Sequence, residues 1–181
     1  MKLTKTKLNS CFILEPKVFA DSRGYFFESF NNRLFKDFTG LNIDFVQDNE
    51  SYSSYGVLRG LHLQKGNYAQ SKLVRVIKGK VLDVAVDVRK ESSTFGQHIS
   101  VEISSENKKQ LFIPRGFAHG FVVLSEEAIF SYKCDNYYNK DSESGVLYND
   151  PKLGIDWQLK KEELIISDKD LLLPNLSNLV L

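Results

Sequence analysis

The chain has 181 residues, of which 42% are hydrophobic and 12% aromatic, enough to build one compact domain with its own core. Its 24 Lys and Arg residues balance 23 Asp and Glu residues, and the resulting net charge of +1 excludes the basic surplus of a protein that binds nucleic acid or acidic membranes. We therefore expect a single domain over residues 1–181 that binds neither nucleic acid nor membrane.

The N-terminal region gives no sign of export. Its apolar run at 11–14 is too short for a signal peptide. The two cysteines, Cys11 and Cys134, have neither the CxxC spacing of a zinc site nor the density of a secreted disulfide scaffold. These features predict a soluble protein of the cytoplasm.

One helix and several strands are expected along the chain. Residues 32–38 place apolar side chains on one helical face, and Gly40 follows as a stop signal. In 81–88 apolar residues alternate with Asp83, Ala85 and Asp87, which predicts a half-buried strand. Further elements complete the pattern: strands at 98–103, 111–114, 121–124 and 128–134, a short helix near Lys160, and an aliphatic tail after Pro174 that packs on the body or on a partner chain.

Glycine-containing turns separate these runs at intervals typical of antiparallel sandwiches and barrels. Strands that alternate with long helices are absent from the pattern, which argues against a doubly wound α/β fold. The fold class predicted from the pattern is therefore all-β.

Two of the three histidines lie where chemistry is conceivable. His98 falls on the polar face of an expected strand and should be exposed, whereas His62 in GVLRGLHLQ and His119 in IPRGFAHGF lie at glycine-marked corners. A lone histidine there is more often structural, and single charged residues are mostly solvated. Together, however, the polar residues near glycines or in strands suggest a lined cavity, in which two arginines could hold a diphosphate through forked donors and a lysine could face an oxyanion. These residues are Arg23, Glu28, Gln47, Asn49, Arg59, Gln64 and Lys72.

The segments around His62 and His119 match parts of the two metal-binding motifs of cupin barrels. Gln64 stands where the first motif has its second histidine, and Tyr68 and Ala69 stand where a glutamate is expected. Two histidines and an amide are a poor ligand set for a transition metal. We therefore expect no metal and no other cofactor.

Seven segments, in this order and spacing, resemble the dTDP-4-dehydrorhamnose 3,5-epimerases. They are FxDxRGxFxESF at 19–30, QDNESYSSYGVLRGLHLQ at 47–64, AQSKLVRVIKGKVLDVAVDVR at 69–89, IPRGFAHGFVVLS at 113–125, YKCDNYY at 132–138, NDPKLGIDW at 149–157 and SDKD at 167–170. The HLQ in place of HxH also matches this family, whose members work without metal. One departure is Gln158, where many members have proline.

The resemblance implies a homodimer of cupin-type double-stranded β-helices, or jelly-roll barrels, with a few short helices, acting on a dTDP-linked 4-keto-6-deoxy sugar. It implies His62 as general base, oriented by Asp170, with Tyr132 as general acid and Lys72 beside the sugar ketone. The positions that would hold the nucleotide sugar are Arg23, Glu28, Gln47, Asn49, Arg59, His119, Glu143 and Lys169. In the family, Arg23 and Glu28 reach across the dimer into the neighbouring site.

The chemistry of the reaction suits these roles. Removing a hydrogen next to a ketone creates an enolate, and a histidine held by a carboxylate is suited to take that proton. Inversion then needs a second group, on the opposite face of the sugar, to return a proton. We expect His62 to be the only histidine with a carboxylate partner. The predicted reaction converts dTDP-4-dehydro-6-deoxy-D-glucose to dTDP-4-dehydro-L-rhamnose. The motifs leave open an epimerase that inverts one carbon, while a 3,4-ketoisomerase and a non-catalytic nucleotide-sugar-binding cupin are less favoured.

Overall fold

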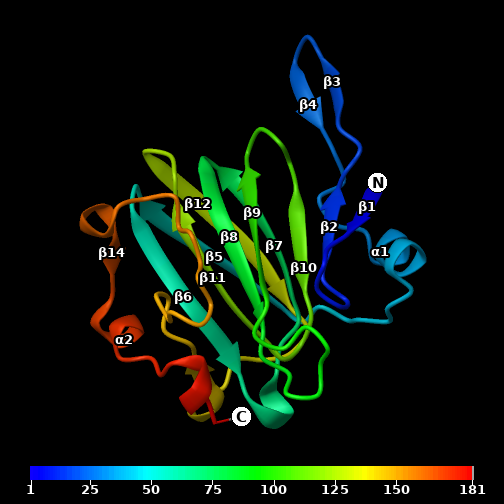
Figure 1. The fold of residues 1–181 in the computed structure, drawn as a ribbon. Coiled ribbons are helices and arrows are strands. Elements are labelled where there is room, and N and C mark those ends of the chain that lie inside the picture. Colours follow the sequence, from blue (N-terminus) through cyan, green and yellow to red (C-terminus); the bar gives the residue numbers. More distant parts are fainter. Residues whose placement is uncertain (181) are drawn as a thin grey trace.

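The computed structural model describes residues 1–180, which form two mainly antiparallel β-sheets and a separate hairpin (Figure 1). The first sheet has the order β1 (Lys2–Lys5), β2 (Phe12–Glu15), β10 (Gln110–Ile113), β7 (Lys72–Lys78), β12 (Glu127–Cys134) and β5 (Gln47–Ser54). The second has the order β13 (Glu143–Gly145), β6 (Val57–Gln64), β11 (Phe117–Val123), β8 (Lys80–Asp87) and β9 (His98–Ser104), and β14 (Ile165–Ile166) pairs with β6 in parallel.

The two sheets face each other and enclose the main hydrophobic core. Val74 and Phe130 point inward from the first sheet, and Ala85 and Phe121 point inward from the second. The rings of Phe121 and Phe130 stack across the interior with their centroids 4.2 Å apart. This arrangement confirms the predicted all-β jelly-roll with few helices.

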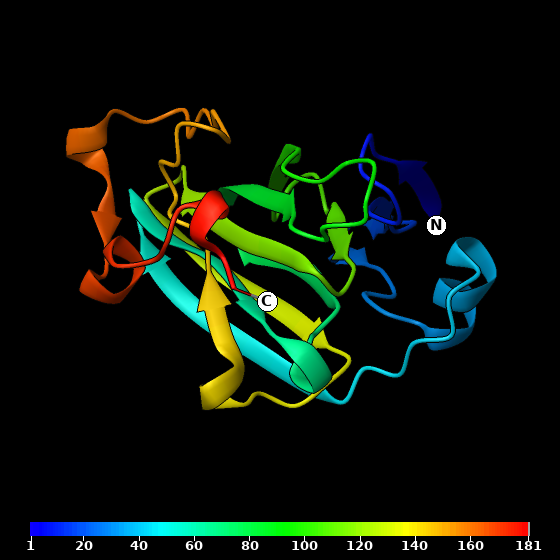
Figure 2. The ribbon, with the colours of Figure 1, turned by 60° about the horizontal axis from the view of Figure 1, so that its bottom comes forward.

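Strand β8 is buried on both faces, so the prediction of a half-buried strand was wrong. Its Leu82 and Val84 side chains pack under a second cluster that includes Val146 and Trp157 from the C-terminal part of the chain. Figure 2 shows this segment lying over the second sheet. The opposite face of β8, which carries the carboxylates, points into the barrel. The alternation of a strand shows which residues share a face but not what covers that face, so the sequence pattern could not predict this burial.

The other sequence expectations are mostly confirmed. The predicted strands correspond to β9, β10, β11 and β12, although β11 begins earlier than expected, at Phe117. The tail after Pro174 packs on the body, where Leu179 joins the second cluster. His98 was expected to be exposed but is half-buried, because it reaches the backbone of Leu153.

Helices are few and short. Helix α1 (Asn32–Thr39) starts where the Asn31 side chain accepts a hydrogen bond from the Leu34 amide, ends at Gly40, and buries Phe35 against the outer face of the first sheet. The expected helix near Lys160 is one 3₁₀ turn, η3 (Lys161–Glu163). The remaining short elements are η1 (Gly66–Tyr68), η2 (Lys140–Ser142), α2 (Asp168–Leu171) and η4 (Leu176–Asn178). Among the described residues, no helix is long and apolar enough to cross a membrane.

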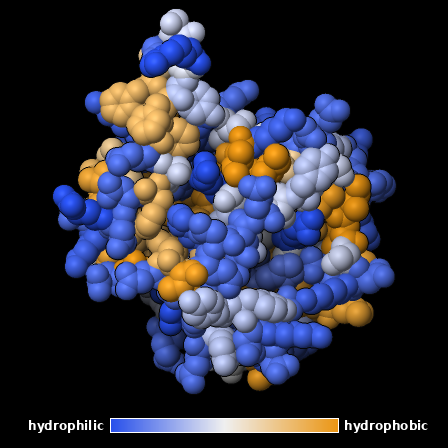
Figure 3. Space-filling view, turned by 180° about the vertical axis from the view of Figure 1, so that it is seen from behind, coloured by the Kyte–Doolittle hydropathy of each residue, from blue (hydrophilic) through white to orange (hydrophobic). Residues whose placement is uncertain are grey.

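The hairpin of β3 (Phe19–Asp21) and β4 (Gly24–Phe26) projects away from both sheets (Figure 1). Its aromatic side chains Phe19, Tyr25 and Phe26 are more than half exposed to solvent. In the view from behind, apolar surface continues from this projection toward the body (Figure 3). An isolated hairpin with exposed aromatics is marginally stable in water, so this segment gains from contact with another surface.

Candidate active site

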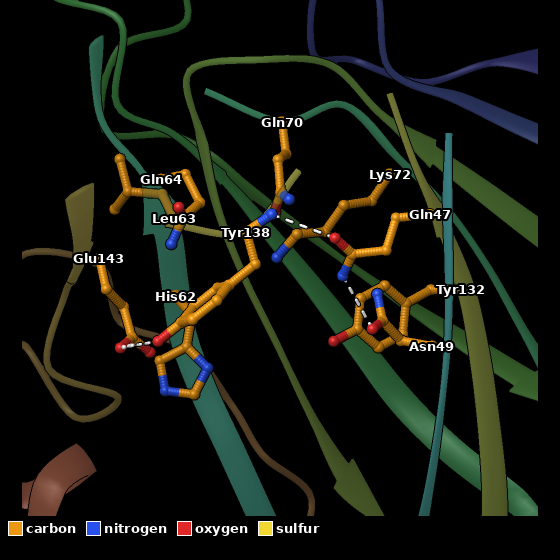
Figure 4. A pocket seen from close by; sticks show the side chains of 10 residues that line it. All are labelled: Gln47, Asn49, His62, Leu63, Gln64, Gln70, Lys72, Tyr132, Tyr138 and Glu143. Carbon is orange, nitrogen blue, oxygen red and sulfur yellow. Dashed lines mark hydrogen bonds between the residues drawn. The ribbon is translucent and has the colours of Figure 1, made fainter. Parts of the chain in front are cut away.

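A polar cavity of about 270 Å³ opens between the two sheets. It is lined by Gln47, Asn49, His62, Leu63, Gln64, Gln70, Lys72, Tyr132, Tyr138 and Glu143 (Figure 4). A second lobe of about 250 Å³ shares four of these residues and extends to Arg59 and His119. The two lobes therefore form one site, to which strands from both sheets contribute.

His62 on β6 is held by Asp170 on α2. Its Nε2 lies 2.7 Å from Oδ1 of Asp170, and the amide of Gly60 donates to Oδ2 of the same carboxylate at 3.1 Å. Ser167 caps the start of α2 by accepting a hydrogen bond from the Asp170 amide. Asp170 is 4% exposed, whereas the His62 side chain is 32% exposed and faces the cavity.

The network around Asp170 keeps its carboxylate charged. Burial raises the pKa of Asp170, but the hydrogen bonds from His62 and Gly60 outweigh this effect, so the pKa lies below its ordinary value. A carboxylate accepts hydrogen bonds and does not donate them, so His62 carries its proton on Nε2. The other ring nitrogen, Nδ1, is then free to accept a proton.

Two glycines let the strands that carry the histidines approach each other closely. Gly60 has a φ of 127°, and a Cβ at this position would lie 2.6 Å from the Cα of Gly120. A side chain at Gly60 would therefore force β6 and β11 apart. His62 and His119 are register partners on these two strands. The close approach thus places both imidazoles on the same wall of the cavity.

Tyr132 and Lys72 belong to the first sheet and line the cavity from the side opposite His62 (Figure 4). The Lys72 Nζ lies 5.9 Å from the centroid of the Tyr132 ring. Burial raises the pKa of the Tyr132 phenol, which therefore keeps its proton near neutral pH. Burial also lowers the pKa of Lys72, and among the described residues no carboxylate lies within ion-pair distance of it.

His119 also has a carboxylate partner, so the expectation that His62 alone would have one was wrong. The Nε2 of His119 lies 3.0 and 2.9 Å from the two oxygens of Asp83 on β8. The sequence pattern predicts Asp83 on the polar side of a half-buried strand, but Asp83 is fully buried inside the barrel. Burial lowers the pKa of His119, although Asp83 opposes this effect.

The rim of the cavity is a connected polar network. Gln47 donates through Nε2 to Oδ1 of Asn49 at 2.9 Å and accepts from the backbone amide of Tyr138 at 3.1 Å. The Tyr138 hydroxyl donates to Oε2 of Glu143 at 3.1 Å, and the same oxygen pairs with Nζ of Lys169 at 2.6 Å. Because Lys169 directly precedes Asp170 on α2, the rim and the His62 pair are joined through one short helix.

Of the expected binding residues, Arg23 and Glu28 lie outside this cavity. Arg59, by contrast, lines it, and its Nε donates to Oγ of Ser53 at 3.0 Å. Arg23 lies instead on the projecting hairpin and pairs with Asp21. Glu28 follows the hairpin and accepts from the side chain of Asn31. The structure of one chain therefore brings together every predicted site residue except Arg23 and Glu28.

Gln64 does not act as a spare metal ligand in this arrangement, because its side-chain oxygen accepts from the amide of Asn139 at 2.9 Å. The Nε2 atoms of His62 and His119 are directed at separate carboxylates. Within residues 1–180, no group of three or more His, Cys, Asp or Glu side chains is arranged to hold a metal ion.

The sequence analysis missed several residues of the site, among them Asp83, Tyr138 and Gln70. Asp83 supports His119, while Tyr138 and Gln70 line the cavity. Asp83 and Gln70 lie in the matched segment 69–89, and Tyr138 ends the matched segment YKCDNYY. The signal was therefore present in those segments. The period-two pattern also grouped Asp83 with Ala85, a residue that points into the core.

Comparison with known proteins identifies the family. The sequence model of the dTDP-4-dehydrorhamnose 3,5-epimerase family matches residues 5–178. The dTDP-4-dehydrorhamnose 3,5-epimerase of Salmonella typhimurium is 57% identical over 157 residues, which cover 87% of this chain and 86% of that protein.

Solved structures agree with this assignment. The dTDP-4-dehydrorhamnose 3,5-epimerase of Elizabethkingia anophelis is 59% identical, with a TM-score of 0.95 over 98% of this chain and 97% of that one. The 3,5-epimerase of Legionella pneumophila in complex with dTDP-4-keto-L-rhamnose is 47% identical, with a TM-score of 0.95 over 99% of this chain and 94% of that one. The resemblance in the sequence is thus confirmed, and this chain belongs to the dTDP-4-dehydrorhamnose 3,5-epimerase family.

Proposed function

We propose that this chain is a 3,5-epimerase that converts dTDP-4-dehydro-6-deoxy-D-glucose to dTDP-4-dehydro-L-rhamnose, without a metal or other cofactor. The observation that carries the proposal is the pair of His62 and Asp170 facing Tyr132 and Lys72 across one cavity. Family membership over nearly the whole chain supports the same reaction.

His62 is the general base in this mechanism. Nε2 holds its proton against Asp170, so Nδ1 takes the hydrogen from the carbon next to the ketone. The resulting imidazolium is stabilised by the Asp170 carboxylate, which burial shields from water. The exposure of the His62 ring to the cavity gives the substrate access to Nδ1.

Lys72 receives the charge that develops on the ketone oxygen. Its Nζ has no carboxylate partner among the described residues, so its N–H groups are available to an enolate. Burial disfavours the isolated cation and lowers its pKa, and a developing negative charge beside it has the opposite effect. A donor placed in advance of the reaction is worth about 2.7–4 kcal/mol by analogy with oxyanion holes.

Tyr132 is the general acid that returns a proton to the opposite face of the ring. It comes from the first sheet and His62 from the second, so the sugar ring between them meets one group on each side. The raised pKa of the phenol keeps it protonated until the enolate needs the proton. Inversion follows because the proton leaves toward one sheet and returns from the other.

The remaining residues of the cavity hold the nucleotide sugar. Arg59 offers forked donors to the diphosphate, and the amides of Gln47 and Asn49 offer polar contacts. Glu143 and Lys169 contribute one charge of each sign at the rim. His119 contacts the sugar from the second lobe.

The active form in this proposal is a homodimer in the cytoplasm. Arg23 and Glu28 are far from their own cavity, and the exposed aromatics of the hairpin would be covered if it docked on a second copy and delivered both residues there. The two buried free thiols suit a reducing compartment. Light scattering should therefore give twice the mass of one 20.7 kDa chain, and a fully active monomer would refute the dimer.

Isotope exchange tests the reaction itself. The protein would be incubated with dTDP-4-dehydro-6-deoxy-D-glucose in heavy water, and deuterium would be counted at each sugar carbon by NMR. Label at the two carbons next to the ketone, with inverted product, is expected. Label at one carbon would make the protein a single-carbon epimerase, and binding without any label would make it a nucleotide-sugar-binding protein.

A further inference from the structure

The buried pair of His119 and Asp83 has a defined geometry. The two residues are diagonal neighbours on adjacent strands, because His119 on β11 lies opposite Ala85 on β8, two residues from Asp83. The methyl side chain of Ala85 leaves room for the imidazole to turn toward the carboxylate. Both oxygens of Asp83 lie within 3.0 Å of Nε2.

This contact decides which nitrogen of His119 carries the proton. Asp83 presents two acceptor oxygens, so Nε2 donates and Nδ1 keeps its lone pair. Burial lowers the pKa of His119, the charge of Lys72 and, once it is protonated, that of His62 lower it further, and only Asp83 opposes them. His119 is therefore neutral and offers an acceptor to its surroundings.

The acceptor faces the cavity. The His119 ring lines the second lobe together with His62, Lys72 and Tyr132. Among the described residues no fully enclosed side-chain nitrogen or oxygen lacks a hydrogen-bond partner, and the partners of His119 are all at Nε2. Nδ1 therefore borders open space that a ligand can fill.

We infer that Asp83 is a positioning residue that holds His119 as its Nε2-protonated tautomer, so that Nδ1 accepts a hydrogen bond from the sugar hydroxyl beside the ketone. The inference rests on the proposed function, because it needs a 4-keto sugar in the cavity. The ketone oxygen can only accept and is met by the donor Lys72, whereas the neighbouring hydroxyl can donate and is met by His119. The two side chains together recognise an α-hydroxy ketone.

The arrangement predicts a preference between substrates. A sugar that lacks this hydroxyl leaves Nδ1 of His119, a side chain that is only 7% exposed, without that partner. An unpaired buried acceptor of this kind lowers kcat/KM roughly 10- to 100-fold. The Asp83→Asn variant should weaken this preference, because an amide can present either its oxygen or its NH₂ group to Nε2 and no longer fixes the tautomer.

The first test is nitrogen-15 NMR of the full-length protein, which has only three histidines. His98→Gln removes the signal of a histidine outside the cavity, and His62→Gln identifies the signals of the base. We expect His119 to show a protonated Nε2 and an unprotonated Nδ1 at neutral pH. A proton on Nδ1, or rapid exchange between both tautomers, would overturn the inference without any variant of Asp83.

The second test compares deuterium exchange at C5 for the parent keto sugar and for its 3-deoxy analogue. The wild type should prefer the parent roughly 10- to 100-fold, and Asp83→Asn should reduce that preference at least several-fold. Asp87→Asn is the matched control, because it removes a buried carboxylate from the same face of β8 away from His119. It should leave both the tautomer and the preference unchanged.

The outcomes separate this inference from the proposed function. If the wild type exchanges the parent sugar but treats both sugars alike, the role of Asp83 is refuted and the epimerase stands. If Asp87→Asn changes the preference as much as Asp83→Asn does, the effect is a general loss of packing and the inference also fails. If the wild type exchanges neither sugar, the proposed function is refuted, and the NMR result still decides the tautomer.

Discussion

Replacing Asp170 with asparagine keeps the size of the side chain and removes the charge that holds His62. The hydrogen bond that it changes is short, at 2.7 Å, and buried, since Asp170 is 4% exposed. A bond assisted by one charge is worth about 1.5–3 kcal/mol. If all of it stabilises the imidazolium in the transition state, its loss slows exchange roughly 10- to 150-fold.

A second effect adds to the first. The amide of the Asp170→Asn variant can donate to Nε2 of His62, which moves the ring proton to Nδ1 and blocks the base. The equivalent change in Ser-His-Asp hydrolases costs about 10⁴-fold in kcat through the wrong tautomer. We therefore expect a fall in kcat of about 10²- to 10⁴-fold, with KM changed less than about threefold, because Asp170 does not line the cavity.

The assay is the rate of deuterium uptake at each sugar carbon in heavy water, with thermal unfolding measured on the same samples. Asp168→Asn is the matched control, because it removes an exposed carboxylate from the same short helix. It should keep near-native rates. A folded Asp170→Asn protein with exchange within about threefold of the wild type would refute the assignment of His62 and Asp170 as the catalytic pair.

Four other outcomes are expected. Gly60→Ala should destabilise the fold by at least about 2 kcal/mol in denaturant unfolding, and by clearly more than Gly24→Ala, which has nearly the same φ but open space around it. Tyr132→Phe should keep exchange within about tenfold and lower inversion roughly 10²- to 10⁴-fold on the same sample; equal losses of both would contradict its role as acid. Exhaustive chelation should leave turnover unchanged, and restoration of lost turnover by one transition metal would contradict the metal-free mechanism. Burial raises the pKa of Asp87, but hydrogen bonds from Arg89, Ser92 and Thr94 outweigh it and lower the pKa to about 2. Ionised Asp87 with its three partners should therefore contribute about 2–3 kcal/mol to the free energy of unfolding, a contribution that is present above pH 4 and is lost as pH falls toward 2. Asp87→Asn should flatten the dependence of the free energy of unfolding on pH over this range.

The sequence predicted the apolar strands β8 to β12 but not the polar strand β5. Strands β8, β9 and β12 were recognisable because one face of each carries apolar residues at every second position, and β10 and β11 because they are short apolar runs. Strand β5 alternates as regularly, but its inward side chains include Gln47, Asn49 and Ser53, which serve the cavity instead of the core. A hydrophobicity pattern cannot mark a strand whose inner face is the site. The family motif over 47–64 supplied those residues instead.

The carboxylate partners show a different limit. Asp170 lies 108 residues from His62 and was found only through the resemblance, while Asp83 lies 36 residues from His119 and was missed. Alternation placed Asp83 on the correct face of β8, opposite Leu82. Alternation could not show that the C-terminal segments cover the apolar face of β8, nor that the face with the carboxylates therefore lies inside the barrel. Such information exists only in the packing of distant segments.

The two pairs of histidine and aspartate use the same side chains for different chemistry, and burial separates them. The His62 side chain is 32% exposed, so its cation can form and be solvated in the cavity as the proton arrives. His119 is 7% exposed and lies beside Lys72, so a cation there would meet a like charge and little water. When His62 becomes an imidazolium, the charge of His119 is disfavoured still further. One pair therefore moves protons, while the other stays neutral and accepts a hydrogen bond from the hydroxyl.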